Sequence, residues 1–201
     1  MTAILIGDII DSSKTISAEW MISLKEVLLE YGQSPTDWEI YRGDEFQLSV
    51  SAEDALVAVY KLKAVMKSLK MDVRISIGLG DVTYEANKVM ERNGTAFIRS
   101  GQLFENLKQK KLSLAIDAGN ENFNTTMNIL FRFAVSVMDG WLPQSAQYVI
   151  EKLKHPDLSQ IELGTRLGIT QAAVSRRHTR SQIDLLLDLE RLYSVEIKKL
   201  A

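Results

Sequence analysis

Residues 38–50 read WEIYRGDEFQLSV, the most informative stretch of the sequence for its fold. Residues 38–41 are a short, mostly apolar run, and from 45 to 50 apolar and polar residues alternate, which is typical of a half-buried strand. Arg42 and Gly43 stand between the two runs, where a tight turn is needed. The stretch therefore predicts a β-hairpin with one apolar face directed at a core.

The segments around this hairpin predict alternating strands and helices. Apolar periodicity and capping signals predict strands at 3–7, 73–79 and 112–116, and helices at about 17–31, 55–69 and 96–109. The order is β-α-β-β-α-β, followed by α and β, which is the split βαβ or ferredoxin-like order. We therefore expect an α+β sheet domain, followed by an all-α part.

Two carboxylates far apart in the sequence are expected to converge on this sheet. In the split βαβ order the first and third strands are antiparallel central neighbours, so one ends where the other starts. Asp8 follows the first predicted strand, and Asp44 precedes the third. Successive strand residues face opposite sides, so we expect only one of Asp44 and Glu45, namely Asp44, to join Asp8.

Such a carboxylate pair suits Mg²⁺ or Mn²⁺. Hard cations prefer oxygen ligands, and Mg²⁺ is commonly held by one or two carboxylates together with substrate phosphates. Two ions of this kind can clamp the attacking and leaving oxygens of phosphoryl transfer. Backbone N–H groups near a helix start, helped by a lysine, can bind the phosphates. The expected phosphate-binding set is Ile10, Asp11, Ser12, Ser13, Lys14, Arg42 and Gly43.

Each acid also has an ordinary explanation. A Gly-Asp pair in a hairpin is commonly turn chemistry, and an Asp after a strand is commonly solvated or caps a helix. Only the predicted topology, which brings Asp8 and Asp44 together, favours a metal site over these explanations.

Three pieces of the first 118 residues carry a resemblance to nucleotide cyclases. The sequence GDIIDSS at 7–13 resembles the first metal motif of the class III nucleotide cyclases. The sequence YRGDEF at 41–46 resembles the hairpin of the GGDEF diguanylate cyclases, and VRISIGLG at 73–80 is similar to the following strand in both families. The whole chain, tail included, resembles the bacterial SatD family.

The resemblance implies a palm-like domain over residues 1–118 that handles a metal-nucleotide. It implies that Asp8, Asp44 and the carbonyl of Ile9 hold metal ions, and that the loop at 10–13 touches a triphosphate.

The sequence also departs from the cyclase patterns. Arg42 replaces the first Gly of the GGDEF motif, where its side chain would crowd a guanine nucleotide. The resemblance places Ile98 and Gln102 where class III cyclases carry the Asn and Arg that stabilise the transition state. Neither side chain can supply a cation to developing phosphate charge. We therefore expect ligand binding without efficient turnover.

A second motif lies in the tail, where residues 158–177 read LSQIELGTRLGITQAAVSRR. Gly168 marks a turn between two short helices, and Thr170 is a favourable N-cap for the second. The run resembles bacterial helix-turn-helix proteins, whose second helix enters the major groove of DNA. The alternative is a helical module that binds a protein or only packs. The expected DNA-contacting residues are Thr170, Gln171, Ala172, Ser175, Arg176, Arg177 and Arg180.

These patterns predict three parts: a palm-like domain at 1–118, a connector helix at 119–142 and a helix-turn-helix domain at 143–201. The last helix has apolar residues at heptad-like spacing, which predicts either packing on its own domain or a homodimer seam. We expect a homodimer. The residues of this stripe are Ile183, Leu186, Tyr193, Ile197 and Leu200.

Composition bounds the remaining possibilities. The chain has 201 residues, a net charge of −2 and no cysteine, which excludes disulfide scaffolds, thiolate metal sites and cysteine nucleophiles. No apolar run suits a signal peptide or a spanning helix, so we expect a cytoplasmic protein without a membrane partner. Residues 151–201 carry nine basic and seven acidic side chains, so this part is basic and the rest is acidic.

The first expectation is a bacterial DNA-binding regulator whose palm-like part binds a metal-nucleotide or another phosphorylated ligand. One alternative is an active metal-dependent nucleotide cyclase or nucleotidyltransferase that uses Asp8 and Asp44. A further alternative is a degenerate palm that serves only as a dimerisation scaffold.

Overall fold

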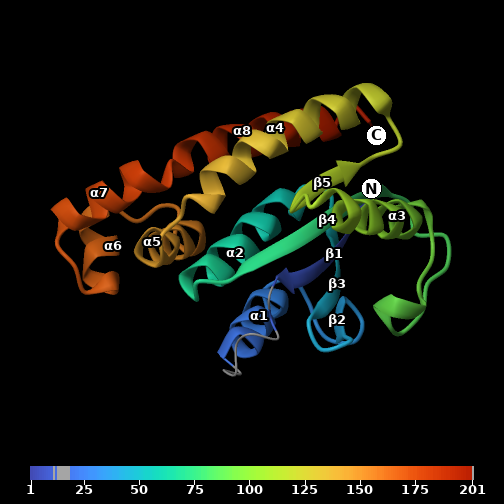
Figure 1. The fold of residues 1–201 in the computed structure, drawn as a ribbon, viewed down its shortest axis with the longest axis horizontal. Coiled ribbons are helices and arrows are strands. Elements are labelled where there is room, and N and C mark those ends of the chain that lie inside the picture. Colours follow the sequence, from blue (N-terminus) through green and yellow to red (C-terminus); the bar gives the residue numbers. More distant parts are fainter. Residues whose placement is uncertain (11, 13–18, 201) are drawn as a thin grey trace.

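The computed structural model describes residues 1–10, 12 and 19–200 (Figure 1). Its strands are β1 (Thr2–Ile10), β2 (Trp38–Tyr41), β3 (Glu45–Ser51), β4 (Asp72–Gly80) and β5 (Leu114–Asp117). Its helices are α1 (Glu19–Leu29), α2 (Ala55–Ser68), the short 3-10 helix η2 (Val89–Glu91), α3 (Thr95–Lys110), α4 (Glu121–Asp139), α5 (Pro143–Lys154), α6 (Gln160–Leu167), α7 (Gln171–Ser181) and α8 (Ile183–Ile197).

These strands form one sheet in the order β2-β3-β1-β4-β5. β1 is antiparallel to both of its neighbours, and β5 joins β4 in parallel. The first four strands thus have the order that the split βαβ pattern requires. The prediction that the first and third strands are antiparallel central neighbours is confirmed. β1 is longer than predicted, because it pairs with β4 from Thr2 through Ile10.

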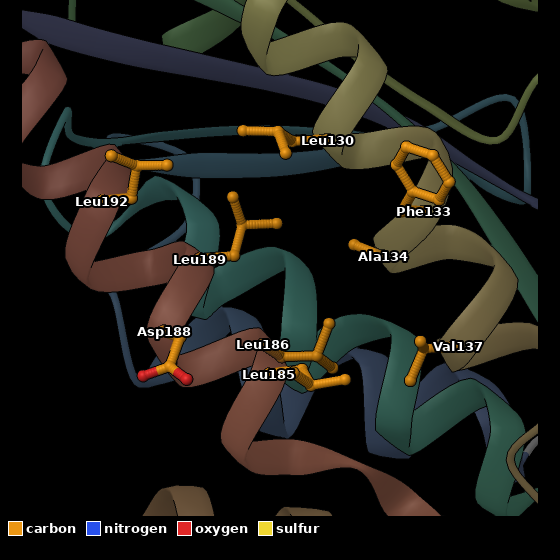
Figure 2. A pocket seen from close by; sticks show the side chains of 9 residues that line it. All are labelled: Leu130, Phe133, Ala134, Val137, Leu185, Leu186, Asp188, Leu189 and Leu192. Carbon is orange, nitrogen blue, oxygen red and sulfur yellow. The ribbon is translucent and has the colours of Figure 1, made fainter.

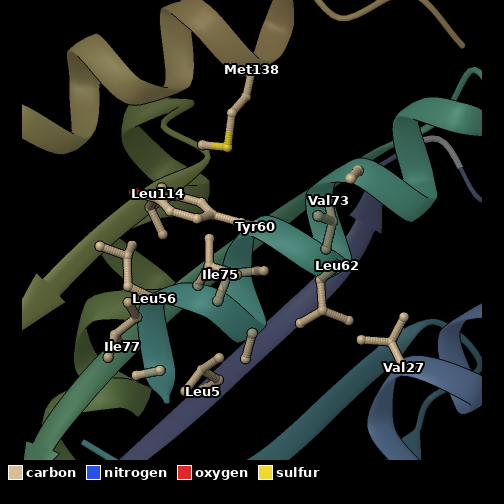
Figure 3. Packing of buried hydrophobic residues seen from close by; sticks show 14 of the residues in the cluster. Leu5, Val27, Leu56, Tyr60, Leu62, Val73, Ile75, Ile77, Leu114 and Met138 are labelled. Atoms are coloured by element: carbon tan, nitrogen blue, oxygen red, sulfur yellow. The ribbon is translucent and has the colours of Figure 1, made fainter. Parts of the chain in front are cut away.

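Different helices cover the two faces of the sheet (Figure 1). Figure 3 shows Leu56 and Leu62 of α2 among the buried residues that include Leu5 and Ile75 of the sheet. The opposite face carries Ile4, which packs with residues of α3 in a smaller cluster. The alternation of β1 therefore directs every second residue, Asp8 included, toward the α3 side.

Small residues in β4 let α3 lie directly on the strand. A Cβ placed on Gly78 would lie 2.2 Å from the carbonyl oxygen of Ala96 and 2.4 Å from the backbone nitrogen of Ser100. The hydroxyl of Ser76, buried beneath the helix, donates to the carbonyl of Ser100 at 2.9 Å. The backbone of α3 is thus held at a distance that only glycine allows at residue 78.

The helices after β5 share their core with α2. Buried residues of α2, α4, α5 and α8 belong to one hydrophobic cluster. Two buried tyrosines bond across it: the Tyr60 hydroxyl donates to the carbonyl of Leu186 at 3.1 Å, and the Tyr193 hydroxyl to that of Ala52 at 2.8 Å. α5 and α8 contact α2, whereas α6 and α7 contact the other helices of the tail, and the predicted division into three parts stays a prediction.

The heptad-like stripe of the last helix faces this shared core. Ile183, Leu186, Tyr193 and Ile197 are between 0% and 2% exposed. The interpretation of the stripe as a dimer seam is therefore wrong, since these side chains are already covered within the chain. The alternative that the sequence left open was packing on the helix's own domain. The stripe is buried within the chain, but its contacts reach beyond residues 143–201, since the Leu186 carbonyl accepts a bond from Tyr60 of α2 and the Tyr193 hydroxyl donates to the Ala52 carbonyl. The homodimer itself stays a prediction.

Candidate functional site

The ends of β1 and β3 meet as predicted. Asp8 lies directly opposite Glu45 in the antiparallel register. One residue further along, the N–H of Ile9 donates a hydrogen bond to the carbonyl of Asp44 at 3.3 Å. Residues separated by more than thirty positions thereby form one acidic rim, made of Asp8, Asp44 and Glu45. We call these three residues the acidic rim.

The expectation that only Asp44 would join Asp8 needs a correction. Residues directly opposite each other in an antiparallel pair point to the same face. Glu45 therefore shares the α3 face with Asp8, whereas Asp44 lies in the turn before β3. The expectation treats Asp44 as a residue of the strand, but β3 begins at Glu45. Because Asp44 precedes the strand, its side chain is not bound by that alternation.

Each acid of the rim has a partner of its own. The Arg74 guanidinium donates to Asp8 at 3.0 Å, and Lys108 of α3 lies 2.6 Å from the Glu45 carboxylate. Asp44 accepts a hydrogen bond from the hydroxyl of Ser12. Sequence reasoning did not include Arg74 or Lys108 in the site. The alternation of β4 could have indicated Arg74, but Lys108 is brought there only by the packing of α3.

A metal ion fits the acidic rim only in part. Carboxylates are suitable ligands for Mg²⁺ or Mn²⁺, but Arg74 and Lys108 already neutralise two of the three acids. Among the described residues, no group of three or more His, Cys, Asp or Glu side chains could hold a metal ion. A cation at Asp8 would have to displace the Arg74 guanidinium.

Burial raises the pKa of the Asp8 carboxyl above its ordinary value of 3.8. Arg74 and Lys108 act against this shift, while Asp44 and Glu45 add to it by repulsion. The Asp8 side chain is 17% exposed, so little water reaches it. A buried acid whose charge is disfavoured despite an ion pair is typical of functional sites, although structural networks show it too.

We expect Asp8→Asn to stabilise the fold at neutral pH by less than about 1 kcal/mol. Because the folded-state pKa of Asp8 is raised, its stabilising contribution is present below pH 3.8 and is lost as the pH rises through the raised value. The neutral Asn avoids that loss. Thermal denaturation should show a variant that gains on the wild type between pH 4 and pH 7. A variant less stable than wild type at pH 7 would mean that the Arg74 ion pair outweighs burial.

The predicted phosphate-binding residues are only partly described. Asp11, Ser13 and Lys14 lie outside the described residues, and Ser12 contacts Asp44. Arg42 has a left-handed backbone (φ 51°), and its side chain is 80% exposed, 4.0 Å from Glu45. Its guanidinium is paired with Glu45 only at this long distance and is open to solvent, so an anion could reach it at the edge of the rim.

The positions that the cyclase resemblance assigns to transition-state stabilisation lie on α3. Ile98 is exposed, and Gln102 is exposed beside it on the same helix. Arg99 is the nearest cation in the sequence, but it donates to the Leu79 carbonyl at 2.6 Å. Leu79 pairs with Ala3, at the opposite end of β1 from Asp8. Arg99 therefore does not serve the acidic rim.

The tail contains the two helices and the turn that its sequence predicts. Ser159 and Glu162 form a reciprocal capping box at the start of α6, and Gly168 ends this helix in the left-handed conformation (φ 65°). The Thr170 hydroxyl then accepts a bond from the Ala173 N–H at 3.2 Å and begins α7. These caps satisfy the backbone groups that the helix ends leave unpaired, and they define the turn.

The start of α7 is accessible, as a helix that reads DNA requires. Gln171, Ala172 and Arg176 are exposed, and Ser175 and Arg177 are half-buried. The Gln171 amide donates to the Gln160 side chain at 2.7 Å, which links the two helices. Thr170 is occupied by its capping bond, so its predicted DNA contact would be made by the backbone or the methyl group.

Three arginines of α7 have no acidic partner. Across the described residues, the guanidinium groups of Arg176, Arg177 and Arg180 make no ion pair or hydrogen bond with the protein. The other predicted contact residues surround them on the same helix. The positive charge of α7 is therefore available to an outside anion.

His178, which the sequence analysis assigns to no site, contacts the two helices next to α7. His178 Nδ1 lies 2.9 Å from the Tyr148 hydroxyl of α5, and its Nε2 lies 2.9 Å from Asp184 of α8. Tyr148 and Asp184 are far apart in the sequence, so no motif could have indicated the arrangement. It ties the end of α7 to the helices on either side.

No protein-family model and no curated protein matches the chain. A search of solved structures found a bacterial light-regulated adenylyl cyclase with 17% sequence identity and a TM-score of 0.42. The aligned part covers 59% of this chain and 43% of that one, so the chain spans less than half of the cyclase chain. The resemblance to the SatD family stays a prediction.

None of the helices built from the described residues combines the length and the apolar character that crossing a bilayer would need.

Proposed function

We propose that the chain is a DNA-binding regulator that places α7 in the major groove. The observation that carries the proposal is the set of three arginines without a partner among the described residues, on a helix whose start is exposed and capped by Thr170. Arginine contacts phosphates and reads guanine edges in the major groove. Helix-turn-helix proteins present their second helix to DNA in this way.

The test is fluorescence anisotropy of the full chain with a labelled random-sequence duplex at low salt, followed by genomic fragments. If the three arginines neutralise phosphates, log affinity should fall with log salt with a slope of roughly −3 for one copy. Absence of any binding at low salt would overturn the proposal. Binding with no preference among genomic fragments would support phosphate contacts without sequence reading.

A second candidate function belongs to the acidic rim. We propose that the rim and the exposed Arg42 take up a divalent cation with a nucleotide or another phosphorylated ligand, which would regulate the tail. The acids and the exposed Arg42 meet at one end of β1 and β3, and this closeness supports the proposal, although a cation at Asp8 would have to displace Arg74. The ferredoxin-like order of β1 to β4 is consistent with the palm-like interpretation and the SatD resemblance.

Thermal denaturation with Mn²⁺ and each nucleoside triphosphate tests the second candidate. We expect a rise in Tm that Asp44→Asn abolishes and that Asp81→Asn, at the opposite end of β4, leaves intact. Chromatography of the same mixtures separates binding from catalysis. A new product that disappears in Asp44→Asn would establish the cyclase or nucleotidyltransferase alternative, and an unchanged Tm in all mixtures would leave the sheet as a scaffold.

A further inference from the structure

An apolar groove runs between α4 and α8 on the side that faces away from the sheet (Figure 2). Figure 2 shows Leu130 and Phe133 of α4 across the groove from Leu185 and Leu189 of α8. Asp188 is its one charged lining residue, and it is paired with Arg191 on its own helix. The groove therefore offers almost no polar group to water.

Both helices carry apolar residues on two sides. The inward sides of α4 and α8 are buried against α2 and its neighbours. Their outward sides also hold large apolar residues: Phe133 is 69% exposed, Leu185 57% and Leu192 42%. A helix that needs only one buried face is expected to be polar on the other. The outward sides are thus apolar without a partner within the described chain.

The exposed apolar area approaches what an interface requires. Together with Ile129 and Val195, which are about half exposed, these side chains present on the order of 500 Å². The largest apolar patch on an ordinary monomer is about 300–600 Å² and is often functional. Each copy would thus contribute about three-fifths of the roughly 800 Å² per partner that a specific complex buries.

We propose that this groove binds a second copy of the chain, so that two α4–α8 pairs form a four-helix bundle. The patch contains both a projecting side chain, Phe133, and a groove of about 410 Å³ that could receive it. A cavity of about 150 Å³ already accepts a benzene ring. Each copy would offer both a projecting side chain and a groove that receives the partner's side chain. The same surface can therefore serve on both copies, as a two-fold interface requires.

Three exposed residues of α8 and the half-buried Leu189 have the spacing of a helical seam. Leu185, Leu189, Leu192 and Val195 follow one another at intervals of four, three and three residues. This is the repeat by which helices pack side by side in bundles. This stripe differs from the buried one that the sequence first indicated, and the two adjoin at the floor of the groove, where Leu186 also lines it.

The measurement is the molar mass of the full chain in solution across a wide range of protein concentrations, by light scattering after gel filtration. We expect the mass of two chains for the wild type and of one chain for Phe133→Glu and Leu192→Glu. Both residues are exposed in the single chain, so their replacement should leave the fold intact, which circular dichroism checks. Ile22→Glu, at an equally exposed apolar residue of α1, is the matched control and should remain dimeric.

Cross-linking tests the two-fold arrangement independently. The chain has no cysteine, so Phe133→Cys and Leu189→Cys each introduce a single thiol. A disulfide dimer that forms mainly when the two variants are mixed would place the knob of one copy in the groove of the other. A wild type that is monomeric at every concentration, or a Phe133→Glu variant that is still dimeric, would overturn the proposal. The measurement uses no DNA, so its outcome is separate from that of the proposed function.

Discussion

Replacing Arg176, Arg177 and Arg180 together by alanine is expected to weaken DNA binding by about a thousandfold, or about 4 kcal/mol. The three guanidinium groups have no ion pair within the described protein, so their removal should change the Tm little. The dependence of affinity on salt should become shallower at the same time, because fewer counterions are released from the DNA. Anisotropy titrations at several salt concentrations measure both effects.

The control for this prediction removes the same charge elsewhere. Lys25→Ala, Lys110→Ala and Lys111→Ala, combined in one variant, delete three exposed lysines from the sheet part of the chain. This variant should bind DNA nearly as well as the wild type. An equal loss in both variants would mean that overall charge, and not α7, attracts the DNA. An unchanged affinity in the arginine variant would contradict the assignment of α7 as the contacting helix.

The second large effect is expected at Gly78. Gly78→Ala should destabilise the protein by about 3 kcal/mol, which is the upper part of the range for overpacked cores. The added Cβ would meet the backbone of α3 at Ala96 and Ser100, and backbone atoms cannot rotate away as a flexible side chain can. α3 would have to lift from β4. For a chain of this length, Tm should fall by roughly 6–12 °C.

Gly101→Ala is the matched control for this prediction. Gly101 lies within α3, and an added Cβ there would meet no atom within 4 Å. Alanine favours the helix over glycine by about 1 kcal/mol, so this variant should be more stable than the wild type. Thermal denaturation of both variants decides the matter. A Gly78→Ala protein as stable as the wild type would mean that α3 can shift on the sheet without cost.

Local signals explain why so much of the fold could be predicted. The alternation in residues 45–50 and the N-cap at Thr170 each act over a few neighbouring residues. Such signals depend on backbone geometry and on nearby side chains, so they can be read along the chain. The turn at Gly168 is of the same kind, because glycine tolerates the left-handed conformation that ends α6.

The candidate site could be predicted only to the level of its acids. The strand order follows from the succession of elements, and that order places Asp8 beside the start of β3. The partners of the acids come from elsewhere: Arg74 from β4 and Lys108 from α3. No local pattern relates Lys108 to Glu45, since the two residues meet only after α3 has packed on the sheet.

Short-range periodicity and chain connectivity settle the helices and strands, their order, the meeting of β1 with β3 and the helix-turn-helix signature. Periodicity also identifies the buried stripe of α8, which includes Leu186 and leaves out its neighbour Leu185, 57% exposed. What that stripe packs against and which residues neutralise the acidic rim depend on the tertiary structure, because Tyr60 of α2 and Lys108 of α3 reach these places only when distant elements pack together.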